Sequence, residues 1–82
     1  MAAPSRQSRA RRRVEAGRIF GRNLRRICVV HNIDAARLVE LSGRSRGAIE
    51  RMLAGKADPT LSLLKHLARS IDVPVAELIR GL

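Results

Sequence analysis

Residues 34–56, DAARLVELSGRSRGAIERMLAGK, decide the fold, because both helices that they predict carry their own start and stop signals. Asp34 is suited to the N-cap of a first helix, since its carboxylate can accept a hydrogen bond from a free backbone N–H. Gly43 is suited to the left-handed position that ends that helix. The sequence therefore predicts a helix over residues 35–42.

A second helix follows after only three residues. Ser45 is its predicted N-cap, apolar residues recur at helical spacing over residues 46–53, and Gly55 ends it. Two short helices joined by a turn of three or four residues that contains glycine form a helix-turn-helix. In that motif the second helix enters the major groove of DNA and presents side chains to the edges of the bases.

The helix predicted over residues 46–53 has one apolar and one polar side. A helical projection places four residues on the side that we expect to be buried, Ala48, Ile49, Met52 and Leu53. It places four on the exposed side, Arg46, Gly47, Glu50 and Arg51. The two arginines are expected to face guanines or phosphates, because a guanidinium matches O6 and N7 of guanine with two hydrogen bonds.

The two other exposed residues of this helix also have predicted roles. Gly47 would allow a close approach to the groove or leave room for a thymine methyl group. Glu50 either accepts a hydrogen bond from a cytosine amine or holds Arg46 through an i, i+4 pair, and the pair is the favoured interpretation.

The rest of the chain also predicts helices and no strand. From Val14 to about His31, apolar residues recur at spacings of three and four, with arginines on the other side. Thr60 is the predicted N-cap of the next helix, and Pro74 suits the first position of a short last one. The predicted fold class is all-α, a compact bundle of five helices around one small core.

Positive charge is concentrated at the start of the chain, which favours a polyanionic partner. The 82 residues carry a net charge of +10, and residues 1–30, with nine arginines and one glutamate, account for +8. Residues 1–13 contain almost nothing to bury, so we expect a disordered, flexible basic arm there, followed by the helix-turn-helix domain over residues 14–82. The arm is expected to contact the DNA backbone or a groove, and the alternative is a solubilising tail. Its arginines are Arg6, Arg9, Arg11, Arg12 and Arg13.

The composition disfavours several other classes of function. Phe20 is the one aromatic residue, which argues against stacking platforms for single-stranded nucleic acid. Cys28 is the one cysteine, so no internal disulfide can form, and we expect it to be a small buried residue. The sequence contains no metal-ligand cluster, phosphate loop or nucleophile–base set, so we expect no metal, no cofactor and no enzyme. The longest apolar run is residues 27–30, too short to cross a membrane, and a cytoplasmic, nucleoid-associated protein is expected.

Taken together, these features resemble the phage repressor/Cro-like (XRE) family of helix-turn-helix regulators. The resemblance covers residues 20–79. It is carried by residues whose type and position agree with the family's pattern, namely Leu38, Gly43, Ser45, Ile49, Gly55, Lys56, Pro59, Leu64, Leu67, Ala68, Ile71, Val73 and Leu78. The resemblance implies a lambda-repressor-like bundle of five helices that binds operator DNA, usually as a dimer on a two-fold site.

The family's pattern also implies roles for individual residues. Ser45 would touch a phosphate, and Lys56 would contact the DNA backbone. The base-reading positions would be Arg46, Gly47 and Arg51. The family often holds a phosphate with a glutamine where this chain has Ala35, so we expect Arg37 and the arm to replace that contact. Arg44, which is expected to be exposed, is a further candidate for the backbone.

The C-terminal segment holds more apolar residues than one small core requires. Ile79 and Leu82 are the favoured candidates for a homodimer interface, while Val75 and Leu78 belong either to that interface or to the core. The predicted function is sequence-specific regulation of transcription through double-stranded DNA, with repression as the expected mode. Two alternatives stay open: the antitoxin or partner-binding member of a two-protein module, and a weakly specific architectural binder in which the arm dominates.

Overall fold

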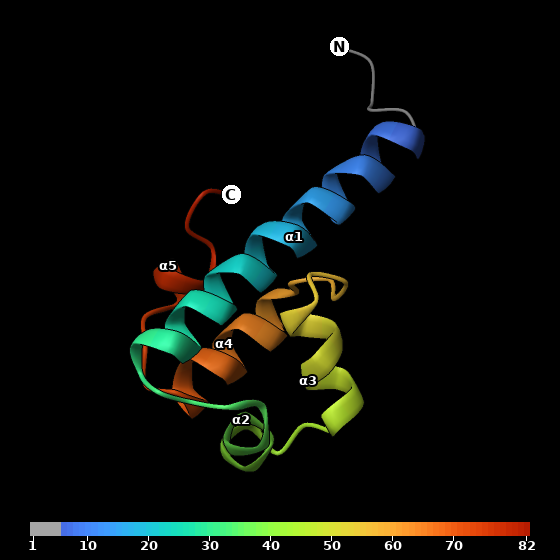
Figure 1. Ribbon diagram of the computed structural model, residues 1–82. Coiled ribbons are helices and arrows are strands. Elements are labelled where there is room, and N and C mark those ends of the chain that lie inside the picture. The colour runs from blue at the N-terminus through green and yellow to red at the C-terminus, as the bar shows by residue number, and fades with distance from the viewer. Residues whose placement is uncertain (1–5) are drawn as a thin grey trace.

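The structure, a computed structural model, describes residues 6–82 as five helices with no strand among them (Figure 1). The helices are α1 Arg6–Val30, α2 Ala35–Ser42, α3 Arg46–Leu53, α4 Leu61–Ser70 and α5 Val75–Leu78. α3 and α5 pack against α1, α2 packs against α3 and α4, and α4 packs against α5. The first turns of α1 project beyond the bundle (Figure 1). The predicted all-α bundle is therefore confirmed.

Every helix contributes at least one fully buried side chain to a single core. These side chains are Phe20 and Leu24 of α1, Leu38 of α2, Ile49 of α3, Leu67 of α4 and Leu78 of α5. Burial of an apolar side chain of this size contributes about 1.5–3 kcal/mol. Leu78 thus belongs to the core, against which Val75 packs while half-buried. Cys28 is buried as expected, and burial raises the pKa of its thiol above the ordinary value.

The helix-turn-helix has the boundaries that its capping residues predict. An Asp34 side-chain oxygen accepts from the backbone N–H of Arg37 at 2.7 Å, which opens α2. Gly43 ends α2 with a φ of 70°, a conformation that favours glycine, and its N–H donates to the carbonyl of Val39. The hydroxyl of Ser45 accepts from the N–H of Ala48 at 3.1 Å and opens α3.

The N-terminal part of α1 differs from the predicted disordered arm. Arg6–Arg13 are helical and form the first turns of α1, a helix of 25 residues, whereas residues 1–5 of the expected arm lie outside the described residues. The physical reason is composition: arginine, glutamine and alanine are good helix formers, and Gly17 is the first glycine or proline after Arg6. No helix boundary falls at the expected junction between residues 13 and 14.

Glycines bring the end of α3 into close contact with α1. A Cβ atom on Gly21 would lie 2.7 Å from the Cα of Gly55, and one on Gly17 would lie 2.9 Å from the carbonyl oxygen of Ala57. Gly55 itself has a φ of 77°. The backbones can therefore approach this closely only because α1 lacks side chains at both positions.

Asn23 ties α1 to the C-terminal segment. This side chain is fully buried, and its Nδ2 donates to the carbonyl oxygens of Leu78 at 2.9 Å and Arg80 at 2.8 Å. The bonds satisfy carbonyls at the end of α5, a helix too short to satisfy its own. Pro74 precedes α5 as its N-cap instead of occupying the predicted first helical position.

Candidate nucleic-acid interface

The outer side of α3 presents the polar residues that helical periodicity predicts. Arg46, Gly47, Glu50 and Arg51 are all exposed. On the inner side Ile49 and Met52 are buried, while Ala48 and Leu53 are half-buried. The predicted division of α3 into a core side and a solvent side is therefore confirmed, and α2 and α1 hold the helix from behind.

Arg46 and Glu50 form the predicted i, i+4 pair. The Nε atom of Arg46 lies 3.1 Å from Oε1 of Glu50. Both side chains are more than half exposed, at 64% and 61%. A pair this exposed is weak, because water screens it, so the guanidinium can exchange the carboxylate for another acceptor at little cost.

Arg51 and Lys56 are brought together at the C-terminal end of α3. The Nη2 atom of Arg51 donates to the carbonyl of Lys56 at 3.3 Å, and the N–H of Lys56 donates to the carbonyl of Arg51 at 2.9 Å. Both side chains are exposed. The Arg51 guanidinium therefore lies against the backbone of Lys56 where the chain leaves α3.

Gly47 leaves an open space on the exposed side of α3. A Cβ atom built at this position would have no atom within 4 Å outside its own helix and its chain neighbours. Nothing in the fold therefore requires a glycine here, and its absence of a side chain matters only to something that approaches α3 from outside.

The remaining predicted contacts of the helix-turn-helix lie around α2 and the turn. Arg37 is exposed and pairs with Glu40 at 3.0 Å on α2. Arg44 is half-buried instead of exposed, because the turn is tight and the Arg44 N–H donates to the hydroxyl of Ser42 at 3.1 Å. Ser45 is exposed, although its hydroxyl already caps α3.

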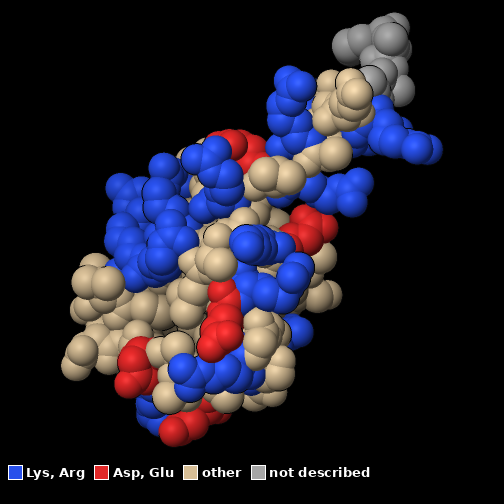
Figure 2. Space-filling view, turned by 45° about the vertical axis from the view of Figure 1, so that its right-hand side comes forward, with Lys and Arg blue, Asp and Glu red and all other residues tan. Residues whose placement is uncertain are grey.

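The predicted arm arginines are displayed along the first turns of α1, and Arg13 among them lines a pocket with Gly55 and Lys56 just past the end of α3. All five, Arg6, Arg9, Arg11, Arg12 and Arg13, are exposed. They belong to the first turns of α1, the end of the helix that projects from the bundle (Figure 1). Figure 2 shows basic side chains spread along the projecting helix and gathered over one side of the bundle, with fewer acidic groups between them.

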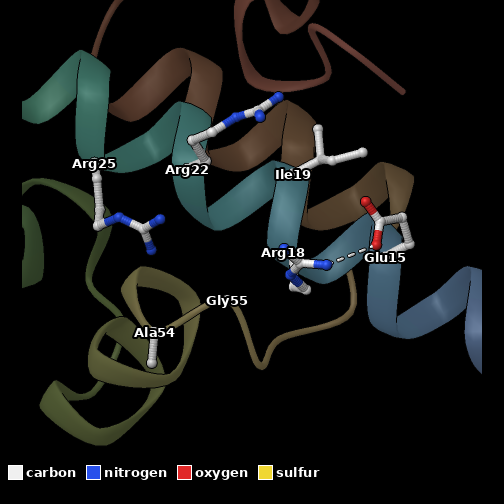
Figure 3. A pocket seen from close by; sticks show the side chains of 7 residues that line it. All are labelled: Glu15, Arg18, Ile19, Arg22, Arg25, Ala54 and Gly55. Atoms are coloured by element: carbon white, nitrogen blue, oxygen red, sulfur yellow. Dashed lines mark hydrogen bonds and ion pairs between the residues drawn. The ribbon is translucent and has the colours of Figure 1, made fainter.

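The structure adds three arginines that the sequence pattern did not single out. Arg18, Arg22 and Arg25 of α1 line a pocket beside Ala54 and Gly55 at the end of α3 (Figure 3). The guanidinium of Arg25 donates to the carbonyl of Leu53 and so caps α3. Their spacing of four and three residues was the available signal, but it could not say what they face.

The two predicted interface residues near the C-terminus differ in exposure. Leu82 is 58% exposed, whereas Ile79 is half-buried and packs against the core. Leu82 is thus available to a second molecule as the chain stands, and Ile79 offers only its outer part.

A helix-turn-helix with an exposed basic outer helix defines a class of DNA-binding proteins. Within that class the chain belongs to the family of the Cro/C1-type HTH DNA-binding domain, whose family model matches residues 23–80. This match confirms the family that the sequence pattern resembles. No curated protein and no solved structure matches the chain significantly.

Residues 6–82 lack the features of two other classes of site. None of the helices there combines the length and apolar character of a membrane span. No three histidine, cysteine, aspartate or glutamate side chains of that part of the chain stand together as a metal site.

Proposed function

We propose that this protein is a sequence-specific transcriptional regulator, acting as a repressor in the cytoplasm, that inserts α3 into the major groove of double-stranded DNA. The observation that carries the proposal is the exposed polar side of α3, on which two arginines flank a glycine. Membership of the Cro/C1-type family supports DNA binding. Repression is proposed because that family is named after repressors of this type.

Specificity comes from Arg46 and Arg51. Each guanidinium can donate two hydrogen bonds to one guanine edge, which discriminates against a wrong base by about 1–3 kcal/mol. Glu50 holds the Arg46 side chain along the surface of α3 in the absence of DNA. Because this exposed pair is weak, the guanidinium can leave Glu50 and donate its hydrogen bonds to a base. Gly47 lets the backbone of α3 approach the base edges.

Position and register come from contacts to phosphates. Lys56 lies beside Arg51 at the end of α3, Ser45 stands at its start, and Arg37 and Arg44 lie around α2 and the turn. Contacts of this kind fix the orientation of the protein on the duplex and carry no sequence information. The five arginines at the start of α1 add to the same sequence-independent part of the binding free energy.

The proposed regulator binds as a homodimer. Helix-turn-helix dimers place two recognition helices about 34 Å apart, one turn of DNA, and so read two half-sites. The exposed Leu82 and the outer part of Ile79 form the proposed contact between copies.

The test is a comparison of Arg46→Ala and Arg51→Ala on selected and random DNA. Duplexes bound by the wild-type protein are first selected from a random pool, and Kd is then measured on the selected site and on a scrambled duplex. Each substitution is expected to weaken binding to the selected site by about 1–3 kcal/mol and to relax the preference for it. Arg69→Ala is the matched control, because Arg69 is exposed on α4.

Equal losses on selected and scrambled DNA would contradict base reading by α3. That result would favour the weakly specific architectural binder, whose affinity comes from phosphates alone. If no duplex is bound at moderate salt, the proposed function is wrong, and the partner-binding alternative gains support.

A further inference from the structure

A pocket of about 190 Å³ opens between α1 and the C-terminal end of α3 (Figure 3). We call it the arginine groove and define it by Arg18, Arg22 and Arg25 on one side and Ala54 and Gly55 on the other. Glu15 is the one acidic residue in its lining. Three arginines against one glutamate give the groove a net positive charge, which favours anions. The guanidinium of Arg22 is directed away from Ala54 and Gly55, towards Gly81, so this side chain must turn to face the groove (Figure 3).

The three arginines border the groove because they lie on α1 beside the contact that its glycines make with the end of α3. The buried residues through which α1 contacts the bundle include Gly17, Gly21 and Leu24. The residue that follows each of them is an arginine of the groove, namely Arg18, Arg22 and Arg25. One residue corresponds to about 100° around a helix. The arginines therefore stand beside the seam where Gly55 meets α1, and not on the opposite side of the helix.

The guanidinium groups of the groove differ in how firmly they are held. Arg25 caps α3 through the carbonyl of Leu53. Arg18 pairs with Glu15 at 3.0 Å, but the two side chains are 70% and 56% exposed, so the pair is easily exchanged. Arg22 is exposed, lies near Gly81, and has no ion pair among the residues that the structure describes. Arg18 is thus free to donate to an incoming anion, and the exposed Arg22 can turn from Gly81 to join it.

The groove adjoins the proposed base-reading face. Ala54 and Gly55 directly follow α3, and on either side of them Arg51 and Lys56 bond to each other. When a recognition helix lies in the major groove, the sugar-phosphate backbone that borders the groove passes the ends of that helix. A phosphate at the C-terminal end of α3 would therefore meet the arginine groove.

We propose that the arginine groove binds a backbone phosphate of duplex DNA on the border of the major groove that α3 occupies, a contact that rests on the proposed function. Arg18 and Arg22 donate to the phosphate oxygens, and Arg25 supplies positive charge from the floor while it stays on α3. Glu15 leaves Arg18 when the phosphate arrives. In this way α1, which carries no base-reading residue, fixes the depth and tilt of α3.

The experiment measures Kd for a scrambled duplex over a range of salt concentrations. Each phosphate contact contributes a slope of about 0.9 in log Kd against log salt. Arg18→Gln combined with Arg22→Gln is expected to lower the slope by about one unit, the value for one phosphate contact, and Arg18→Gln alone by less. Glu15→Gln is expected to tighten binding several-fold, because it removes the competing carboxylate. The matched control is Arg69→Gln, which removes one exposed charge from α4, outside the groove.

Thermal unfolding of each variant shows whether the fold is kept, and Arg25 is left intact because it caps α3. Equal slopes for the double variant and for Arg69→Gln would overturn the proposal while wild-type binding and base reading stand. If the wild-type protein binds no duplex, it is the proposed function that fails.

A second measurement separates DNA phosphate from a free anion. The arginine Nε–H resonances are followed by NMR during titration with the duplex and, separately, with inorganic phosphate. We expect those of Arg18 and Arg22 to shift with micromolar duplex and to need far higher concentrations of inorganic phosphate. Saturation by inorganic phosphate at the lower concentration would overturn the proposal, because the groove would then be a site for a small anion.

Discussion

Gly21, in the middle of α1, and Gly47, in the first turn of α3, occupy opposite environments. Behind Gly21 stands the backbone of another segment, with the Cα of Gly55 only 2.7 Å from where a Cβ would be. In front of Gly47 there is open solvent. Glycine costs about 1 kcal/mol relative to alanine in a helix, so each position needs a reason for it. For Gly21 the reason is packing, whereas the fold supplies none for Gly47, which fits the proposed close approach to DNA.

Substitution by alanine should separate these two reasons. Gly47→Ala is expected to raise the free energy of unfolding by up to about 1 kcal/mol, since the helix gains propensity and nothing clashes. The same change is expected to weaken binding to the selected DNA site, because the new methyl group meets the base edges. Gly21→Ala is expected to destabilise the protein by about 1–3 kcal/mol, because the contact is with backbone that cannot move aside easily.

Denaturant unfolding and duplex binding are measured on both variants. A Gly47→Ala protein that is more stable and binds DNA as tightly as the wild type would remove the argument for close approach at this position. A Gly21→Ala protein of unchanged stability would mean that α1 and the segment after α3 can separate freely.

At the scale of the elements, the helix boundaries that could be predicted are those set by local sequence signals. The bounds of α2 and α3 were predictable because Asp34, Gly43 and Ser45 act on backbone groups within three or four residues of themselves. The start of α1 was not, because arginine-rich sequence is typical both of a disordered arm and of an exposed helix. Without a cap or a glycine near residue 13, composition alone could not choose between them.

One part of the candidate site could likewise be predicted from the sequence, and another part could not. The exposed side of α3 follows from periodicity alone, and so Arg46, Gly47, Glu50 and Arg51 were identified. The arginine groove depends on the contact between Gly21 and Gly55, which are 34 residues apart in the chain. Sequence pattern shows that Arg18 and Arg22 share a side of α1, but only the tertiary contact shows that this side borders α3.

The projecting turns of α1 make a prediction at this scale. Replacing Arg6, Arg9, Arg11, Arg12 and Arg13 by glutamine keeps good helix formers and removes five charges. Binding to selected and scrambled duplexes is expected to weaken alike, and the salt slope to fall by about 0.9 for each phosphate that the protein no longer touches. Deletion of residues 1–13 should give the same slope. Stability should barely change, because these side chains are exposed.

Binding isotherms over several salt concentrations check this prediction, with circular dichroism as the control for helix content. An unchanged slope in both variants would mean that the start of α1 is a bystander, as the alternative of a solubilising tail predicts. A weaker affinity in the deletion alone would instead show that the helix, and not its charge, matters.

For the whole molecule, charge and shape are matched to a long anionic partner. The described chain measures 44 × 24 × 20 Å, and α1 gives it the long dimension. Of the net charge of +10, residues 31–82 carry only +2, from eight basic and six acidic residues. Positive charge is therefore concentrated on α1 (Figure 2). Under the proposed function, this charge steers the protein to DNA from a distance before α3 makes its contacts.

The proposed homodimer gives the last prediction, which concerns the whole molecule. Leu82 lies at the end of the chain, past α5, which packs against α1 and α4 and leaves α3 free to enter DNA. Leu82→Ser is expected to shift the protein towards monomer in sedimentation at micromolar concentration, and Ile79→Ser to do so at some cost in stability, since Ile79 is half-buried. Leu61→Ser is the matched control, because Leu61 is similarly exposed, at 63%, on α4.

Affinity for a duplex with two half-sites should fall in the Leu82 variant while affinity for a single half-site stays the same, because α3 is unaltered. If Leu82→Ser and Leu61→Ser leave the same fraction of dimer, the contact between copies lies elsewhere on the molecule.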